Sequence, residues 1–198
     1  KVLIGLLCSS VLGLCGAFLL TWCVIRISRL LTRDQTRRTF SSLQLVSASF
    51  MAFSHGMNDG QKFIGVFVLA LMTGGHLQSF AVPVWVVLLC AAIMALGTSL
   101  GGWRIIRTMG IRLVHLEPFQ GFTAEASASG VIIFASLFGI PVSTTHTIGT
   151  SIMGSGLAHR SSSMKLGTLK NIVTAWILTF PACGLLAFLI TLTLRLVF

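Results

Sequence analysis

Charged residues are scarce in this sequence, and acidic residues are the scarcest of them. Charged side chains make up 9% of the 198 residues, only four residues are Asp or Glu, and 55% are hydrophobic. Water-soluble domains carry far more charge, so this composition excludes the ordinary soluble classes and is typical of membrane proteins. We therefore predict an all-α, multi-pass protein of the cell membrane, inner or plasma, whose main solvent is lipid.

The signatures of metal, cofactor and disulfide chemistry are missing as well. The five cysteines form no CxxC pair and their number is odd, and the sequence has no HExxH, P-loop or dinucleotide-binding motif. Ser143 and His146 resemble a nucleophile and a base, but no G-x-S-x-G motif surrounds the serine. We expect no cofactor, no metal site and no enzymatic activity.

Long apolar windows predict transmembrane helices, because ~20 apolar residues of helix cross a ~30 Å hydrocarbon layer. No linker or low-complexity segment divides the chain, so residues 1–198 are interpreted as a single transmembrane domain. The predicted spans are residues 2–25, 43–73, 83–100, the two-part segment 121–157, and residues 172–194.

The positive charge of the chain indicates how these spans are oriented. The formal net charge is +10, and the connection at residues 74–82 contains no Lys or Arg. The positive-inside rule predicts that the basic loops are cytoplasmic and that this connection lies outside, with no role in nucleic-acid binding. Residues 103–118 are predicted to form a short interfacial helix. The basic clusters are Arg26, Arg29, Arg33, Arg37 and Arg38; Arg104, Arg107 and Arg112; and Arg160, Lys165 and Lys170.

A carboxylate and an amide lie inside the apolar window 43–73. Asn58 and Asp59 stand between Gly56 and Gly60, and the whole window would be about 46 Å long as one helix. We predict that the helix breaks at residues 56–60, since irregular backbone at membrane depth normally lines a cavity. The oxygen atoms there would suit Na⁺, or Asp59 would take a proton, and free N–H groups of the following helix would suit an anion.

A second interrupted helix is predicted within the segment 121–157. Pro141 stops the first part, and Ser143, Thr144 and Thr145 begin the second. These hydroxyl groups either cap the helix or donate hydrogen bonds to a bound anion. The sequence leaves open whether the turn reaches the outer surface or returns midway as a re-entrant hairpin. Paired interrupted helices are typical of a transport site.

Ionisable side chains surround both interruptions. Lys62 follows Asp59 by three residues, and it forms either a structural salt bridge or a fixed positive charge beside a substrate. His55 and His146 flank the two motifs and either make structural hydrogen bonds or handle protons. Glu125 lies in an apolar window, where a charge costs at least ~2.5 kcal/mol, so we expect it to face a cavity, to meet a partner or to be neutral.

Together these segments resemble the inorganic phosphate transporters of the PiT type. SHGMNDGQK, residues 54–62, is similar to the family's glycine-x-asparagine-aspartate signature, and residues 121–156 resemble the segment that ends in its serine-threonine-threonine-histidine motif. The connection GGWRIIRTMG between them is also similar. Family members have two inverted repeats, whereas this chain carries one copy of each motif and begins with Lys1. The resemblance implies the second, C-terminal repeat, one half of an inverted-repeat transporter. The chain is then either a fragment of a longer transporter or one half of a split or dimeric one, whose partner is a first-repeat half or a second copy of the chain.

The resemblance also implies a substrate and a mechanism. Lys62 replaces the second asparagine of the commoner signature and resembles the bacterial low-affinity branch, which is associated with proton coupling and with uptake of metal-phosphate complexes. We predict cation-coupled phosphate symport by alternating access, in which Lys62 replaces a bound Na⁺ and a proton is the coupling ion. The positions implied for phosphate are Asn58, Asp59, Ser143, Thr144 and Thr145, and those implied for the coupling ion or charge balance are Asp59, Lys62, Gln120 and Glu125.

Two other interpretations stay open on the sequence. In one, the chain is a non-transporting membrane subunit whose interrupted helices pack against a partner. In the other, it transports a different oxyanion, such as sulfate.

Overall fold

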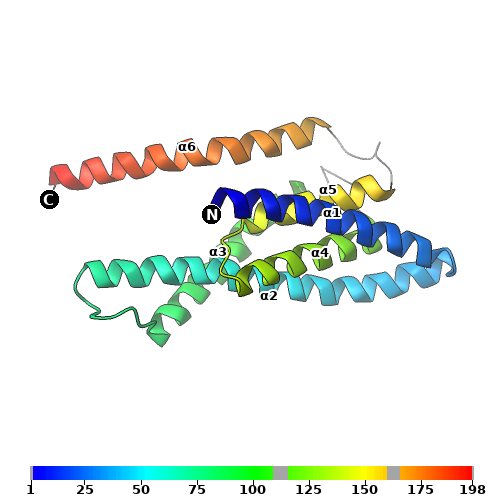
Figure 1. Cartoon of the computed structure of the whole chain (residues 1–198), viewed down its shortest axis with the longest axis horizontal. Coiled ribbons are helices and arrows are strands. Elements are labelled where there is room, and N and C mark those ends of the chain that lie inside the picture. The colour runs from blue at the N-terminus through cyan, green and yellow to red at the C-terminus, as the bar shows by residue number, and fades with distance from the viewer. Residues whose placement is uncertain (1, 109–115, 160–165, 198) are drawn as a thin grey trace.

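The fold is helical throughout the part of the chain that the structure describes. The computed structural model describes residues 2–108, 116–159 and 166–197, and these segments contain no strand. The all-α class predicted from composition is confirmed. The helices are α1 (Val2–Ser28), α2 (Arg33–Thr73), α3 (Val84–Arg107), α4 (Pro118–Leu137), α5 (Thr144–His159) and α6 (Leu166–Val197) (Figure 1).

Among the described residues, three helices are long and apolar enough to cross a membrane. The spans are Val2–Ser28, Val84–Trp103 and Gly167–Leu196, and they coincide with three of the predicted windows. The interfacial helix predicted at residues 103–118 does not begin where expected, because α3 continues through Arg107. Residues 109–115 of that segment lie outside the described residues. The sides of the membrane assigned from the basic loops stay a prediction.

The predicted break at residues 56–60 is wrong, because α2 runs without interruption through both glycines. Thr32 starts the helix with a capping box, in which its hydroxyl accepts from the Gln35 N–H and its own N–H donates to the Gln35 side chain. Glycine costs a helix about 1 kcal/mol but, unlike proline, removes no backbone hydrogen bond. The 41 residues of α2 span about 61 Å, so the helix extends well beyond Asp59 in both directions.

The second predicted interruption is confirmed, because six non-helical residues separate α4 from α5. α4 starts at Pro118, whose fixed φ suits the first helical position, and ends at Leu137. Gly139 has φ of 62°, a left-handed conformation that favours glycine, and the N–H of Ile140 returns to the Ala135 carbonyl. The chain therefore turns back, and α4 and α5 pack together as a hairpin.

α1 packs against both helices of this hairpin. Small residues at every fourth position of α1 are buried, which lets the helix backbones approach closely. An added Cβ at Gly13 would lie 2.8 Å from the Thr147 carbonyl oxygen. Further along, the hydroxyl oxygens of Thr21 and Thr123 are 2.6 Å apart, and Thr21 donates to Ser155 over 2.9 Å. Hydroxyl groups and close backbones, rather than large apolar side chains, join these helices.

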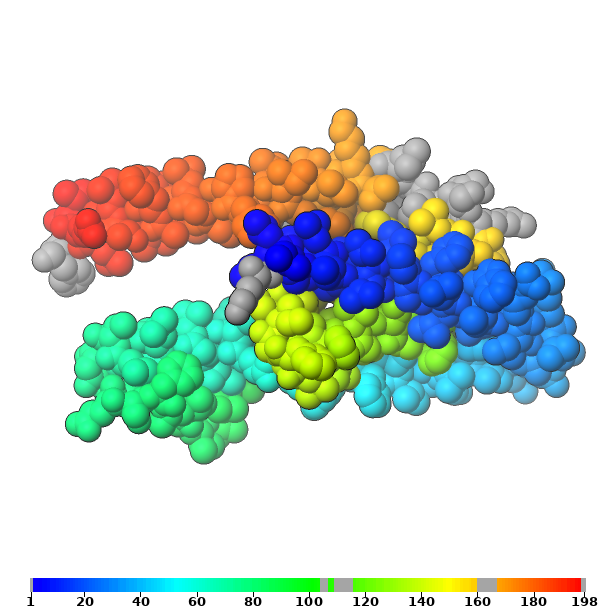
Figure 2. Space-filling model, viewed as in Figure 1, coloured from blue at the N-terminus to red at the C-terminus, as the bar shows by residue number. Residues whose placement is uncertain are grey.

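Two arms extend from this bundle toward the same end of the molecule. Figure 2 shows them as α6, in orange to red, and the second half of α2 with α3, in cyan to green. Both arms expose large apolar side chains, including Phe188 (63% exposed) and Leu100 (86% exposed). Such surfaces fit lipid or an apolar partner, not water.

Candidate functional site

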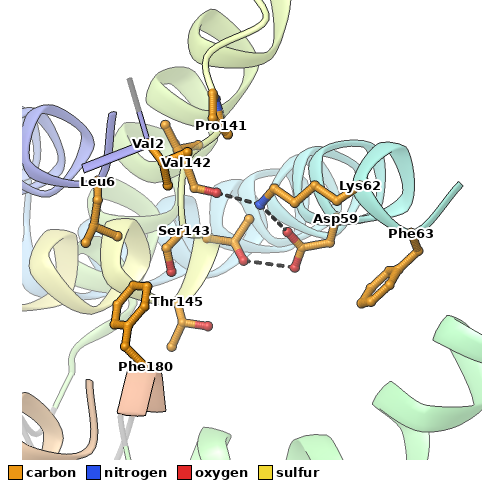
Figure 3. Close-up of a pocket in the computed structure, with 11 residues that line it drawn as sticks. Val2, Leu6, Asp59, Lys62, Phe63, Pro141, Val142, Ser143, Thr145 and Phe180 are labelled. Carbon is orange, nitrogen blue, oxygen red and sulfur yellow. Dashed lines mark hydrogen bonds and ion pairs between the residues drawn. The ribbon is translucent and has the colours of Figure 1, made fainter. Parts of the chain in front are cut away.

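The loop of the α4–α5 hairpin meets the middle of α2, and a cavity of about 430 Å³ lies at this junction. Figure 3 shows Asp59 and Lys62 of α2 directed toward the loop, with the backbone carbonyl of Val142 facing them. Leu6 of α1 and Phe180 of α6 add apolar side chains to the wall. Four helices and one loop therefore build the cavity, and its polar groups come from the two motif segments.

Asp59 forms hydrogen bonds with both segments. Its Oδ1 accepts from Asn58 Nδ2 and from Lys62 Nζ, each at 3.0 Å. Its Oδ2 accepts from Thr144 Oγ1 at 3.2 Å and lies 3.4 Å from His55 Nδ1. The carboxylate thus joins the middle of α2 to the first turn of α5, although 85 residues separate Asp59 from Thr144.

Lys62 has two oxygen partners at the junction. Besides its ion pair with Asp59, its ammonium group donates to the Val142 carbonyl at 2.6 Å, and Asn58 Nδ2 reaches the same carbonyl at 3.3 Å. The predicted structural salt bridge is therefore present. Lys62 also lines the cavity, so its role as a fixed charge beside a substrate stays a prediction.

Ser143 caps α5 at the edge of the cavity. Its hydroxyl accepts from the His146 N–H at 3.4 Å, and its carbonyl accepts from the Thr147 N–H at 3.0 Å. The Ser143 hydroxyl oxygen also lies 2.8 Å from His146 Nδ1. Thr144 and Thr145 follow in the first turn and line the cavity with Ser143. The capping interpretation of this motif is observed, and its hydroxyl groups still border the space where an anion would bind.

Gln120 does not belong to this cavity. It is buried near the start of α4, where its side chain accepts a hydrogen bond of 3.0 Å from the Glu117 N–H and so closes the helix end. Its backbone carbonyl oxygen accepts hydrogen bonds from the hydroxyl groups of Thr123 and Ser155. The structure therefore gives Gln120 a capping contact, and nothing brings it to Asp59.

Glu125 faces a second cavity, of about 1030 Å³, between α2, α3 and the hairpin. Its carboxylate accepts a hydrogen bond of 2.5 Å from Ser47 of α2. This second cavity is also lined by His55, Thr144 and Thr145. Because both threonines line the first cavity as well, they lie between the cavity that Glu125 faces and the cavity that Asp59 faces. The expectation that Glu125 faces a cavity holds, whereas its role toward a coupling ion stays a prediction.

Three groups at the site were not found by sequence reasoning. The carbonyl of Val142 is a backbone atom, and its only signal was its position between Pro141 and the start of α5. Phe180 lines the cavity and Trp176 contacts His146, both from α6, more than 30 residues after the hairpin loop. Neither aromatic residue lies in a motif, so only the tertiary structure reveals them.

Comparisons with known proteins agree with the resemblance drawn from the motifs. A Probable low-affinity inorganic phosphate transporter of Rhizobium meliloti is 44% identical over 178 residues, covering 89% of this chain and 52% of that protein. A protein of the same description from Bacillus subtilis is 34% identical over 203 residues, covering 100% of this chain and 60% of its own length. The chain thus spans about half the length of the curated relatives it matches.

A solved structure and a family match extend this comparison. The structure described as the sodium-dependent phosphate transporter has a TM-score of 0.65 and 29% identity, and the match covers 75% of this chain and 38% of that one. The Phosphate transporter family matches residues 1–187, which is nearly the whole chain. On this match, and on the motifs that converge around Asp59, the chain belongs to the phosphate transporter family.

Proposed function

We propose that this chain supplies one half of an inorganic phosphate transporter and that phosphate binds in the cavity between Asp59 and the first turn of α5. The observation that carries the proposal is the contact of 3.2 Å between Thr144 and Asp59, which places both motifs on one cavity. The first turn of a helix leaves backbone N–H groups without intrahelical partners and favours an anion. Hydroxyl groups of Ser143 and Thr145 add further donors there.

The charge of phosphate has to be balanced in this cavity, because Asp59 already contributes a negative charge. A sodium ion, a proton on Asp59, or the ammonium group of Lys62 would each supply the balance. Lys62 occupies the position between two oxygens, the Asp59 carboxylate and the Val142 carbonyl, that a hard cation would seek. We propose that Lys62 takes the place of a bound sodium ion and that a proton is the coupling ion in an alternating-access cycle.

Uptake by the natural protein that contains this chain is therefore expected to be independent of sodium. Labelled phosphate uptake should be equal in sodium and choline media and should collapse when a protonophore is added. The Lys62→Asn variant opens a place for a cation between Asp59 and Val142, so its residual uptake should rise with sodium. Lys170→Asn, which removes a lysine of α6, is the matched control and should behave like the wild type. Sodium-dependent uptake by the wild type would refute the proposed coupling.

The choice of oxyanion is tested by competition. Phosphate and arsenate share a tetrahedral shape and protonated forms at neutral pH, whereas sulfate carries no proton to donate. We expect excess arsenate to suppress labelled phosphate uptake and excess sulfate to leave it unchanged. Equal suppression by sulfate would indicate a general oxyanion transporter.

A further inference from the structure

Trp176 contacts the candidate site without lining its cavity. Its indole ring and the His146 imidazole have centroids 4.0 Å apart and an interplanar angle of 30°. Trp176 also packs against the small apolar cluster of Ala124, Ile152 and Met153. Because almost all of the α6 span is exposed, this contact is one of the few places where α6 meets the hairpin. The ring therefore fixes the imidazole from the side of α6.

His146 in turn faces Ser143 with two nitrogen atoms. Its backbone N–H donates to the Ser143 hydroxyl oxygen at 3.4 Å, and its Nδ1 lies 2.8 Å from the same oxygen. A hydroxyl group has two acceptor lone pairs and one hydrogen. When Nδ1 carries the imidazole hydrogen, both lone pairs of Ser143 face donors of His146, and the single hydroxyl hydrogen is left for the cavity. Phosphate oxygens are acceptors, so this orientation favours them.

The opposite orientation would disfavour phosphate. If the imidazole ring turned away, the Ser143 hydroxyl would lose its partner on that side and would be free to rotate its hydrogen away from the cavity. Its lone pairs would then face the cavity and repel an anion. Turning the imidazole away would break its ring contact with Trp176, so this contact disfavours the rotation. Phe180, one helical turn after Trp176, lines the same cavity as Ser143.

We propose that Trp176 is a positioning residue for phosphate: it holds the His146 ring, in the tautomer that carries its hydrogen on Nδ1, so that the Ser143 hydroxyl donates its own hydrogen into the cavity. The inference rests on the proposed function, since it assumes that phosphate binds beside Ser143. It adds to the site a residue of α6 that lies outside both motifs. It also gives His146 the role of orienting the Ser143 hydroxyl group, in place of proton handling.

The effect should appear in the KM of phosphate uptake. We expect Trp176→Leu, which keeps an apolar side chain but removes the aromatic face, to raise KM about fivefold with Vmax within about twofold, because the lost hydrogen bond goes to a charged ligand. Trp176→Phe restores an aromatic face and should recover most of the affinity. The matched control is Phe188→Leu, an exposed aromatic residue of the same helix, which should not change KM.

A double-mutant cycle separates positioning from a general packing effect. Ser143→Ala should itself raise KM about tenfold, and in that background Trp176→Leu should cause no further rise, since the hydroxyl it orients is gone. Equal increases in both backgrounds, or an unchanged KM in the single variant, would overturn the inference while leaving the proposed function intact. Absence of phosphate uptake by the wild type would instead refute the proposed function itself.

A second pair of variants keeps the test decisive if Trp176→Leu does not accumulate. His146→Asn places a side-chain donor near the position of Nδ1, whereas His146→Ala removes the side-chain donor and keeps the backbone N–H. We expect His146→Asn to keep a KM within about twofold of the wild type and His146→Ala to raise it about fivefold, again without effect in the Ser143→Ala background. Equal KM values for the two variants would contradict the proposed orientation of Ser143.

Discussion

Replacing Asp59 by asparagine is expected to abolish phosphate uptake while the protein still inserts in the membrane. In the wild type, three donors converge on the carboxylate, from Asn58, Lys62 and Thr144, and His55 Nδ1 lies 3.4 Å away. An amide places an NH₂ group against the donors of one carboxylate oxygen and leaves the Lys62 ammonium without its counter-charge. Losing two hydrogen bonds to a charged group, at about 1.5 kcal/mol or more each, corresponds to a loss of about 100-fold or more in uptake.

Insertion should be unaffected, because an uncharged side chain is cheaper to place in a membrane than a carboxylate. The measurement is labelled phosphate uptake normalised to the amount of protein in the membrane. Asp34→Asn changes an acidic residue in the first turn of the same helix and is expected to leave uptake at the wild-type level. Wild-type uptake by the Asp59→Asn variant would show that Asp59 is not on the transport path. Normal assembly together with no uptake by the wild type would favour the non-transporting subunit.

The second large effect is expected at Gly154, where α5 crosses α1. A Cβ at this position would overlap the carbonyl oxygen of Leu14, a backbone atom that cannot move without the whole helix. Overpacking a well-packed interior costs about 1–3 kcal/mol and more when the obstacle is backbone. Gly154→Ala should therefore lower the thermal unfolding temperature in detergent and reduce the yield of folded protein.

Gly130 provides the matched control for this substitution. It lies in the other helix of the hairpin, and an added Cβ there has no neighbour within 4 Å. Gly130→Ala should leave the unfolding temperature unchanged or raise it slightly, since alanine favours a helix over glycine by up to about 1 kcal/mol. If the two variants unfold at the same temperature, the close approach of α1 and α5 does not stabilise the protein.

The failed prediction of a break in α2 shows the limit of local reasoning. Three poor helix formers lie at this point of α2: Gly56, Asn58 and Gly60. Each of them costs the helix only a fraction of the free energy that its continuous hydrogen bonding provides. Pro141 is different, because its ring obstructs the preceding turn and it follows closely on Gly139, whose φ of 62° turns the chain back. Proline alone does not suffice, since α6 continues through Pro181. The interruption beside Pro141 was therefore predictable, whereas the two glycines do not interrupt α2 at all.

The sequence by itself determined the helical class, three apolar spans, the interruption at Pro141 and the two motif segments. These follow from local physics: hydropathy over a window of about 20 residues, and the backbone chemistry of proline. Tertiary structure decided that Asp59 meets Thr144 and Val142, that Gln120 caps a helix away from the cavity, and that Trp176 of α6 reaches His146. Those contacts depend on how α2, the hairpin and α6 pack, and packing joins residues far apart in the chain that no local pattern relates.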